Sequence, residues 1–115
     1  MEKLTAKKIA RHPDVVWREE TEIRDKILEV LKRGEDDSSV SEQGTVSLVI
    51  SGTIYQLNLL GGEIWKLSDG SLAVEGIADS LSSTFDIEKE VLLEDVKEFV
   101  VDLLAKGWLI YKDAL

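Results

Sequence analysis

The chain has 115 residues, with 14 lysines and arginines against 23 aspartates and glutamates, and it carries a net charge of −9. This length suits one domain around a single hydrophobic core. Because it has no cysteine and one histidine, His12, thiol catalysis and thiolate metal sites are excluded, and a Ser–His–Asp triad would depend on a charged N-terminal stretch. We expect a small cytoplasmic protein without a membrane segment, cofactor, bound metal or catalytic activity.

The charge is unevenly distributed along the chain. Residues 1–33 hold nine basic and seven acidic residues, whereas residues 34–115 hold five basic and sixteen acidic residues. Nucleic-acid binding needs clustered cations, so we expect no nucleic-acid partner. Two interpretations of the acidic region remain open: it keeps the protein soluble, or it matches a partner of basic character.

The first twenty residues contain two segments of different character. Residues 1–13 are polar and are expected to form a flexible N-terminus. Residues 14–20 combine β-branched and aromatic side chains and predict a short strand. We expect the folded domain to begin at this strand and to end at residue 111, with a tail over residues 112–115.

An amphipathic helix is predicted over residues 21–33, because the apolar side chains there recur at helical spacing. Thr21 is the expected N-cap and Gly34 the expected stop, while a strand is the alternative structure for this segment. An acidic, serine-rich loop is predicted over residues 35–43. Together, residues 21–43 form an insertion of helix and loop within the domain.

A β-hairpin is predicted over residues 45–58. Two runs rich in β-branched residues flank a Ser-Gly pair, which is a typical hairpin turn. Alternation in the second run places Ile54 and Gln56 on one face. The other face then carries Thr53, Tyr55 and Leu57.

Three helices and a last strand are predicted after the hairpin. Asn58 is suited to cap a short helix over residues 59–67. A second helix is expected over residues 71–85 and a longer one over residues 87–106, each with apolar residues at helical spacing. Residues 108–111 read as a short final strand.

This order of elements is typical of an α+β fold of the winged helix-turn-helix type, with N-terminal antiparallel strands followed by three helices. Such domains usually bind DNA through a helix that presents basic or amide side chains. The helix over residues 87–106 instead carries six acidic residues against three lysines. We therefore regard sequence-specific DNA binding as disfavoured.

The helix over residues 87–106 carries more apolar surface than it needs to pack against a single neighbouring element. Val96, Val100 and Leu103 centre its predicted buried face, with Leu92 and Phe99 beside them. Leu93, Val101 and Leu104 form a second strip beside that face. This strip is either additional core, a dimer contact, or one wall of a peptide-binding groove. The strand over residues 53–57 would supply the other wall if it lies at a sheet edge, where free main-chain groups accept an added strand.

The alternative for that strand is pairing on both sides, with Tyr55 packed in the core. Trp65 and Trp108 lie within apolar periodic stretches and are expected in the core, whereas Trp17 is either buried or partly exposed. The acidic runs have no companion histidine and no calcium-loop spacing, so solvated surfaces explain them better than a metal site.

Several short motifs, in this order and spacing, resemble the PqqD-like family over residues 45–111. They are Tyr55-Gln56-Leu57-Asn58, Gly62-Glu63-Ile64-Trp65-Lys66-Leu67, Asp69-Gly70, Ile77 with Leu81, Asp95-Val96, Phe99-Val100, Leu103, and Gly107-Trp108-Leu109. The stretch over residues 57–65 further resembles PqqD-type proteins of GeoRSP-like radical SAM peptide systems.

The resemblance implies a RiPP recognition element, which is a non-catalytic winged-helix peptide chaperone. It would bind the leader of a ribosomally made precursor peptide and present it to a radical SAM/SPASM enzyme. In this family the leader adds a strand to the third strand, against the last helix. Carried onto this chain, the resemblance implies that the peptide-binding strand residues are Thr53, Ile54, Tyr55, Gln56 and Leu57. The helix residues expected to face them are Leu93, Lys97, Val101 and Leu104, which helical spacing places on one side of the last helix.

Two questions stay open at this point. The main alternative function is an acidic winged-helix adaptor, or transcription-associated regulator, that acts through protein contacts. The second question concerns assembly, because the first predicted strand pairs either within the chain or across a homodimer.

Overall fold

The computed structural model describes residues 7–34 and 43–114. The chain divides into two compact units, and each is described by itself. One contains Met1–Pro13 with Ile64–Leu115, and the other contains Asp14–Glu63. The predicted acidic loop over residues 35–43 lies outside the described residues except for Gln43.

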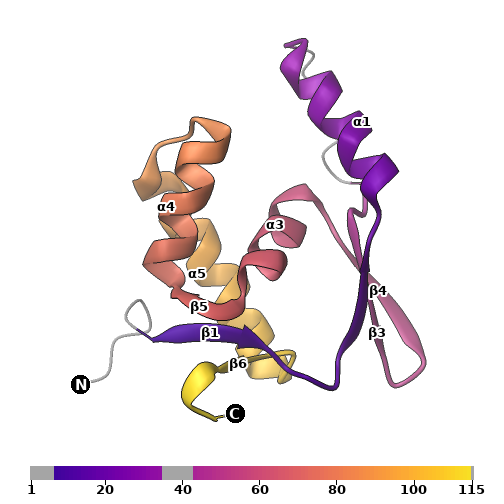
Figure 1. Ribbon diagram of the computed structural model, residues 1–115, viewed down its shortest axis with the longest axis vertical. Helices are drawn as coiled ribbons and strands as arrows, with labels where there is room; N and C mark the ends of the chain where they lie inside the picture. Colours follow the sequence, from indigo (N-terminus) through magenta and orange to yellow (C-terminus); the bar gives the residue numbers. More distant parts are fainter. Residues whose placement is uncertain (1–6, 35–42, 115) are drawn as a thin grey trace. The chain divides into compact units, whose positions relative to one another are not determined.

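In the first unit, β1 (Lys8–Arg11) lies between β5 (Asp69–Ala73) and β6 (Leu109–Tyr111), and both neighbours are antiparallel to it (Figure 1). The prediction of a flexible segment is therefore wrong for residues 8–11. Ile9 and Ala10 are buried there. Two apolar residues in a polar stretch carry no periodicity, so this strand is recognisable only from its distant partners.

The start of the second predicted helix also needs correction. Residues 71–73 belong to β5, and α4 begins only at Val74 and continues to Phe85. Gly70 has a φ of 91°, and the carboxylate of Asp69 accepts a hydrogen bond of 2.9 Å from the N–H of Ser71. This local turn chemistry competes with helix formation and delays the helix start.

The helix α5 (Lys89–Lys106) packs beside α4 in the same unit (Figure 1). It ends where predicted, because Gly107 adopts the left-handed conformation with a φ of 79° and accommodates the C-terminal cap. The predicted buried face of α5 is confirmed, since it contributes four buried side chains: Leu92, Val96, Val100 and Leu103. The short 3-10 helix η2 (Lys112–Ala114) follows β6.

In the second unit, β3 (Val46–Ile50) lies between β2 (Val16–Glu19) and β4 (Thr53–Leu57), all antiparallel. The predicted hairpin is confirmed. Ser51 and Gly52 form its two-residue loop with φ angles of 51° and 82°, the conformation that tight hairpins require. Because β2 pairs with β3, the first predicted strand pairs within the chain.

The helix α1 (Thr21–Lys32) is confirmed, but Thr21 is not its cap. Glu20 occupies the N-cap position and makes no side-chain cap hydrogen bond. Its carboxylate instead accepts hydrogen bonds from Arg18 and Ser47. The helix start is thus determined by the end of β2 rather than by a hydroxyl cap.

The helix α3 (Leu59–Leu67) has its predicted bounds and the predicted cap, because the side-chain oxygen of Asn58 accepts a 2.9 Å hydrogen bond from the N–H of Gly61. Its first turns lie very close to β3. A Cβ atom at Gly62 would overlap Oγ1 of Thr45 and lie 3.0 Å from Cγ2 of Val46. Glycine at this position therefore permits the close approach.

The α+β class with antiparallel strands is confirmed. The described residues contain four α-helices, counting α1, rather than strands followed by three helices. The winged-helix arrangement stays a prediction. Within the residues that the structure describes, no helix is both long enough and apolar enough to cross a bilayer.

Candidate functional site

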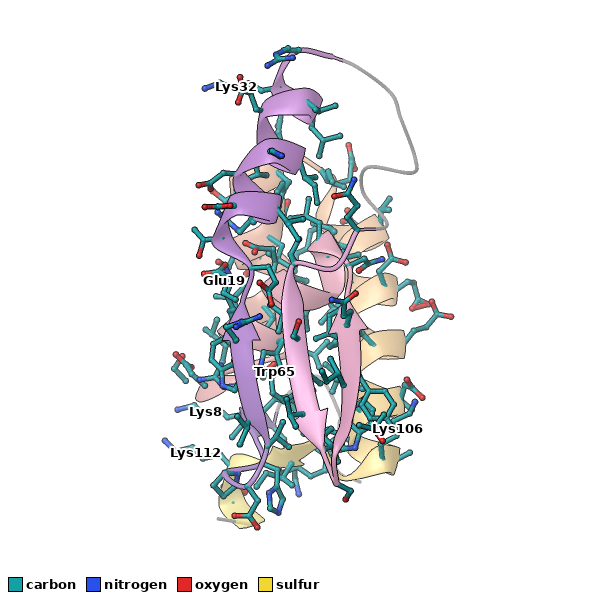
Figure 2. The ribbon with its side chains drawn as sticks, turned by 90° about the vertical axis from the view of Figure 1, so that its right-hand side faces the viewer. Lys8, Glu19, Lys32, Trp65, Lys106 and Lys112 are labelled. Carbon is teal, nitrogen blue, oxygen red and sulfur yellow. The ribbon has the colours of Figure 1, made fainter. Side chains whose placement is uncertain are left out.

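The strand β4 lies at the edge of its three-stranded sheet, paired with β3 on one side and with no other described strand on the opposite side. Figure 2 shows β3 between the other two strands. The first four residues of β4 are exposed and Leu57 is half-exposed. Of the two alternatives left open by the sequence, the edge position applies to the described part of the chain, and Tyr55 is not a core residue.

Hairpin geometry determines which main-chain groups of β4 are available for pairing. Thr53 closes the two-residue loop, and hydrogen-bonded and non-hydrogen-bonded pairs alternate from that point. Ile54 and Gln56, which lie opposite Val49 and Ser47, occupy the non-hydrogen-bonded positions. Their N–H and C=O groups consequently point away from β3, toward the edge.

The side chains of Ile54 and Gln56 lie on one face of the sheet, which we call the outer face. The ladder aligns Val16, Val49 and Ile54 in one row across the three strands. Their side chains are 65%, 41% and 66% exposed, respectively. A row of exposed aliphatic side chains thus crosses the sheet and ends at the β4 edge.

A second row of the outer face is polar and aligns Arg18, Ser47 and Gln56. Arg18 and Ser47 both donate hydrogen bonds to the carboxylate of Glu20, at 3.0 to 3.1 Å. These bonds, from Arg18 first and then Ser47, lower the pKa of Glu20 below its ordinary value. Arg18, Glu20 and Ser47 therefore form a hydrogen-bonded polar group beside the aliphatic row.

Both rows contribute to one shallow hollow of about 410 Å³ on the outer face. Its lining comes from all three strands and from the residue after β2: Val16, Trp17, Arg18, Glu20, Ser47, Val49, Ile54 and Gln56. Sequence reasoning included Ile54 and Gln56 among the binding residues but missed the remainder. Alternation within residues 14–20 would have placed Val16 and Arg18 on a common face, but not beside the hairpin.

The predicted helix residues lie on one side of α5, in the first unit. Leu93, Lys97 and Leu104 are half-buried, whereas Val101 is 51% exposed. Lys97 and Val101 line a shallow hollow of about 560 Å³ on α5, together with Glu98, Asp102 and Ala105. The strand and helix residues belong to different units, so a groove formed by both remains a prediction.

The aromatic expectations have mixed outcomes. Trp65 is fully buried, as predicted. Trp108 is only half-buried, and the ammonium group of Lys106 lies 5.6 Å from its ring centroid. Trp17 is half-buried. Among the side chains that the structure describes, no group of three or more histidines and carboxylates is arranged to hold a metal ion.

Comparison with known proteins identifies the family. The model for coenzyme PQQ synthesis protein D (PqqD) matches residues 40–109. The chain belongs to the PqqD family. The match includes the whole β3–β4 hairpin and the three helices α3, α4 and α5, so the β4 edge lies within the PqqD region of the chain.

A solved structure shares the PqqD fold with this chain. It is the solution NMR structure of the PqqD truncation of Methylobacterium extorquens PqqCD, described as a functional, stand-alone RiPP recognition element. The TM-score is 0.61, the sequence identity is 18%, and 92% of each chain is covered. At this identity the likeness establishes the fold alone. The search of curated proteins finds no match.

Proposed function

We propose that this PqqD-family protein is a non-catalytic peptide chaperone. It binds the leader of a ribosomally synthesised precursor peptide by strand addition along β4 and presents it to a radical SAM/SPASM enzyme in the cytoplasm. The observation that carries this proposal is the exposed edge of β4 in a chain of this family. The Methylobacterium protein of the same fold is itself described as a RiPP recognition element.

Strand addition suits the chemistry of β4. An extended peptide gains affinity from main-chain hydrogen bonds and specificity from alternate side chains. Ile54 and Gln56 occupy the non-hydrogen-bonded positions of the hairpin, so their N–H and C=O groups would face such a peptide. The site includes the whole strand from Thr53 to Leu57, because Tyr55 offers an aromatic surface on the face opposite Ile54.

The helix α5 is the proposed second wall of the site, through Leu93, Lys97, Val101 and Leu104. The half-exposed Val101 and the hollow beside it support this assignment. The surrounding carboxylates of Glu98 and Asp102 would favour an approaching peptide with basic residues. Because binding alone makes and breaks no covalent bond, modification of the peptide is assigned to the partner enzyme.

A proline substitution tests strand addition directly. Gln56→Pro removes one edge-facing N–H that β3 does not use, so the sheet should survive while peptide affinity falls about tenfold or more. Gln56→Ala is the matched control, since it shortens the same side chain and keeps the N–H. The probe is the leader of a precursor peptide encoded beside this gene, titrated by calorimetry, with amide shifts recorded by NMR.

Binding without amide shifts in β4, or equal affinity of the proline and alanine variants, would overturn strand addition. Complete absence of binding would favour the alternative function, an acidic adaptor that contacts folded proteins.

A further inference from the structure

The outer face presents an aliphatic row whose three side chains are exposed in the described part of the chain. Val16, Val49 and Ile54 are each 41% to 66% exposed. They lie directly opposite one another across the ladder. Exposed aliphatic side chains gathered in one place typically mark an interaction surface, whereas isolated ones do not.

The row ends at the strand edge, and this position indicates what covers it. Cross-strand neighbours on one face have Cβ atoms about 5 Å apart, so a strand added to β4 extends every row by one side chain. The row that includes Ile54 would gain one peptide side chain, and an aliphatic side chain there would cover the exposed surface of Ile54. A peptide at this edge is therefore in a position to cover the most exposed residue of the row.

In the neighbouring polar row, the side chains of Arg18 and Ser47 make hydrogen bonds, and the Gln56 side chain at the strand edge makes none within the described part of the chain. Arg18 and Ser47 donate to Glu20, whereas the amide of Gln56 makes no hydrogen bond to any described residue. The Gln56 side chain lies close to the backbone of Gly44, because a Cβ atom built at Gly44 would come within 2.8 Å of its Cβ and 3.0 Å of its Oε1. Its amide group is thus available to a polar side chain on an added strand.

We infer that the outer face reads two side chains of the bound peptide, spaced two residues apart. One is aliphatic and lies opposite Ile54, and the other is a hydrogen-bonding polar residue opposite Gln56. This inference rests on the proposed strand addition and deepens it, because it names the class of peptide sequence that β4 accepts. The spacing follows from the two-residue period of a strand.

The expected loss of peptide affinity follows from the contact that each peptide side chain makes with the outer face. An aliphatic peptide residue at this position adds a cross-strand contact and also buries methylene groups. Replacing the aliphatic peptide residue by alanine should therefore weaken binding about 5- to 10-fold. Replacing the polar residue should weaken it about 2- to 5-fold.

The experiment uses the full chain and a phage-displayed library of random linear peptides, each about twelve residues long. The tightest binder is synthesised, its position on the protein is mapped by amide shifts, and each of its residues is replaced by alanine in turn. The same series is titrated against Ile54→Ala. Leu31→Ala is the control, because Leu31 is also an exposed aliphatic residue but lies in α1.

The expected result is an aliphatic and a polar position two residues apart in the selected peptides. The alanine effect at the aliphatic position should disappear in Ile54→Ala and persist in Leu31→Ala. Peptides that shift the β4 amides without this pattern would overturn the inference and leave strand addition intact. If no peptide shifts those amides, strand addition fails and the inference fails with it.

A second copy of this chain is the competing occupant of the edge, through pairing of β4 with β4. Sedimentation of the wild type and of Ile54→Lys distinguishes the two cases. A monomer with the peptide pattern supports the inference. A dimer that dissociates in Ile54→Lys would overturn it, because the aliphatic row would then be covered by the second copy.

Discussion

The guanidinium group of Arg24 in α1 donates two hydrogen bonds to the carboxylate of Glu63 in α3, at 2.9 and 3.1 Å. The Glu63 side chain is only 9% exposed, and the carboxylate of Glu19 lies 3.6 Å from the same guanidinium. The hydrogen bonds that Arg24 donates to the carboxylate of Glu63 are the main cause that raises the pKa of Arg24. The pair connects the inserted helix to the first turns of α3.

We expect Arg24→Met to lower the free energy of unfolding by about 1–2 kcal/mol, because a nearly buried carboxylate loses a paired cation. Urea denaturation of the full chain measures this loss. Arg33→Met is the matched control, since Arg33 lies just after the same helix and its pair with Glu29 is solvent-exposed. The control should change stability by less than about 0.5 kcal/mol. Equal losses in the two variants would contradict the assigned role of Arg24.

Gly62→Ala should destabilise the protein by about 1–3 kcal/mol, because the added methyl group overlaps Thr45 and forces α3 away from β3. Gly76→Ala in α4 is the comparison, since its methyl group meets only the side chain of Leu72, at 3.0 Å or more, and gains helix propensity. Thermal unfolding followed by circular dichroism measures both. A stable Gly62→Ala protein would mean that the close approach is not required.

Asn58→Ala should cost about 1 kcal/mol, because the first turn of α3 loses the side-chain acceptor of the Gly61 N–H. Asn58→Asp should retain most of the stability, since aspartate accepts the same hydrogen bond and its charge is favourable at a helix N-terminus. Hydrogen exchange at Gly61 reports the cap locally. Exchange that is unchanged in Asn58→Ala would argue against the cap.

The lowered pKa of Glu20 predicts a stability that depends on pH. Because the folded-state pKa lies below the unfolded one, the contribution is fully present above about pH 4.3 and is lost as the pH falls through the folded pKa. Wild type should therefore exceed Glu20→Gln in stability at neutral pH, and this difference should shrink on acidification. Urea midpoints across the acidic range test this, and a constant difference would refute it.

Val101→Gln should weaken peptide binding several-fold and leave the unfolding free energy within about 0.5 kcal/mol of wild type, because Val101 is 51% exposed. The buried neighbour Val100 gives the contrast, since Val100→Gln places an amide in the core and should destabilise the fold by several kcal/mol. Calorimetric titration with the leader probe measures the binding. Unchanged affinity in Val101→Gln would remove this residue from the site.

Elements with a strong local signal were predicted well from the sequence. The hairpin follows from alternation around Ser51-Gly52, and α3 begins after Asn58 because that side chain caps it. The strands β1 and β5 were missed, because their stability comes from pairing between residues about 60 positions apart in the chain. The N-cap of α1 was misassigned because a hydroxyl residue stood one position after the true cap.

The sequence by itself determined three properties of the protein: motif spacing indicated the family, composition excluded thiol chemistry, and strand alternation gave the two faces of residues 53–57. All three can be read along the chain without knowing which distant segments pair. Only the tertiary structure placed β4 at an edge and aligned Val16, Val49 and Ile54 in one exposed row. Strand order and register depend on which distant segments pair. For that reason the outer face could be recognised only after β2 was seen to pair with β3.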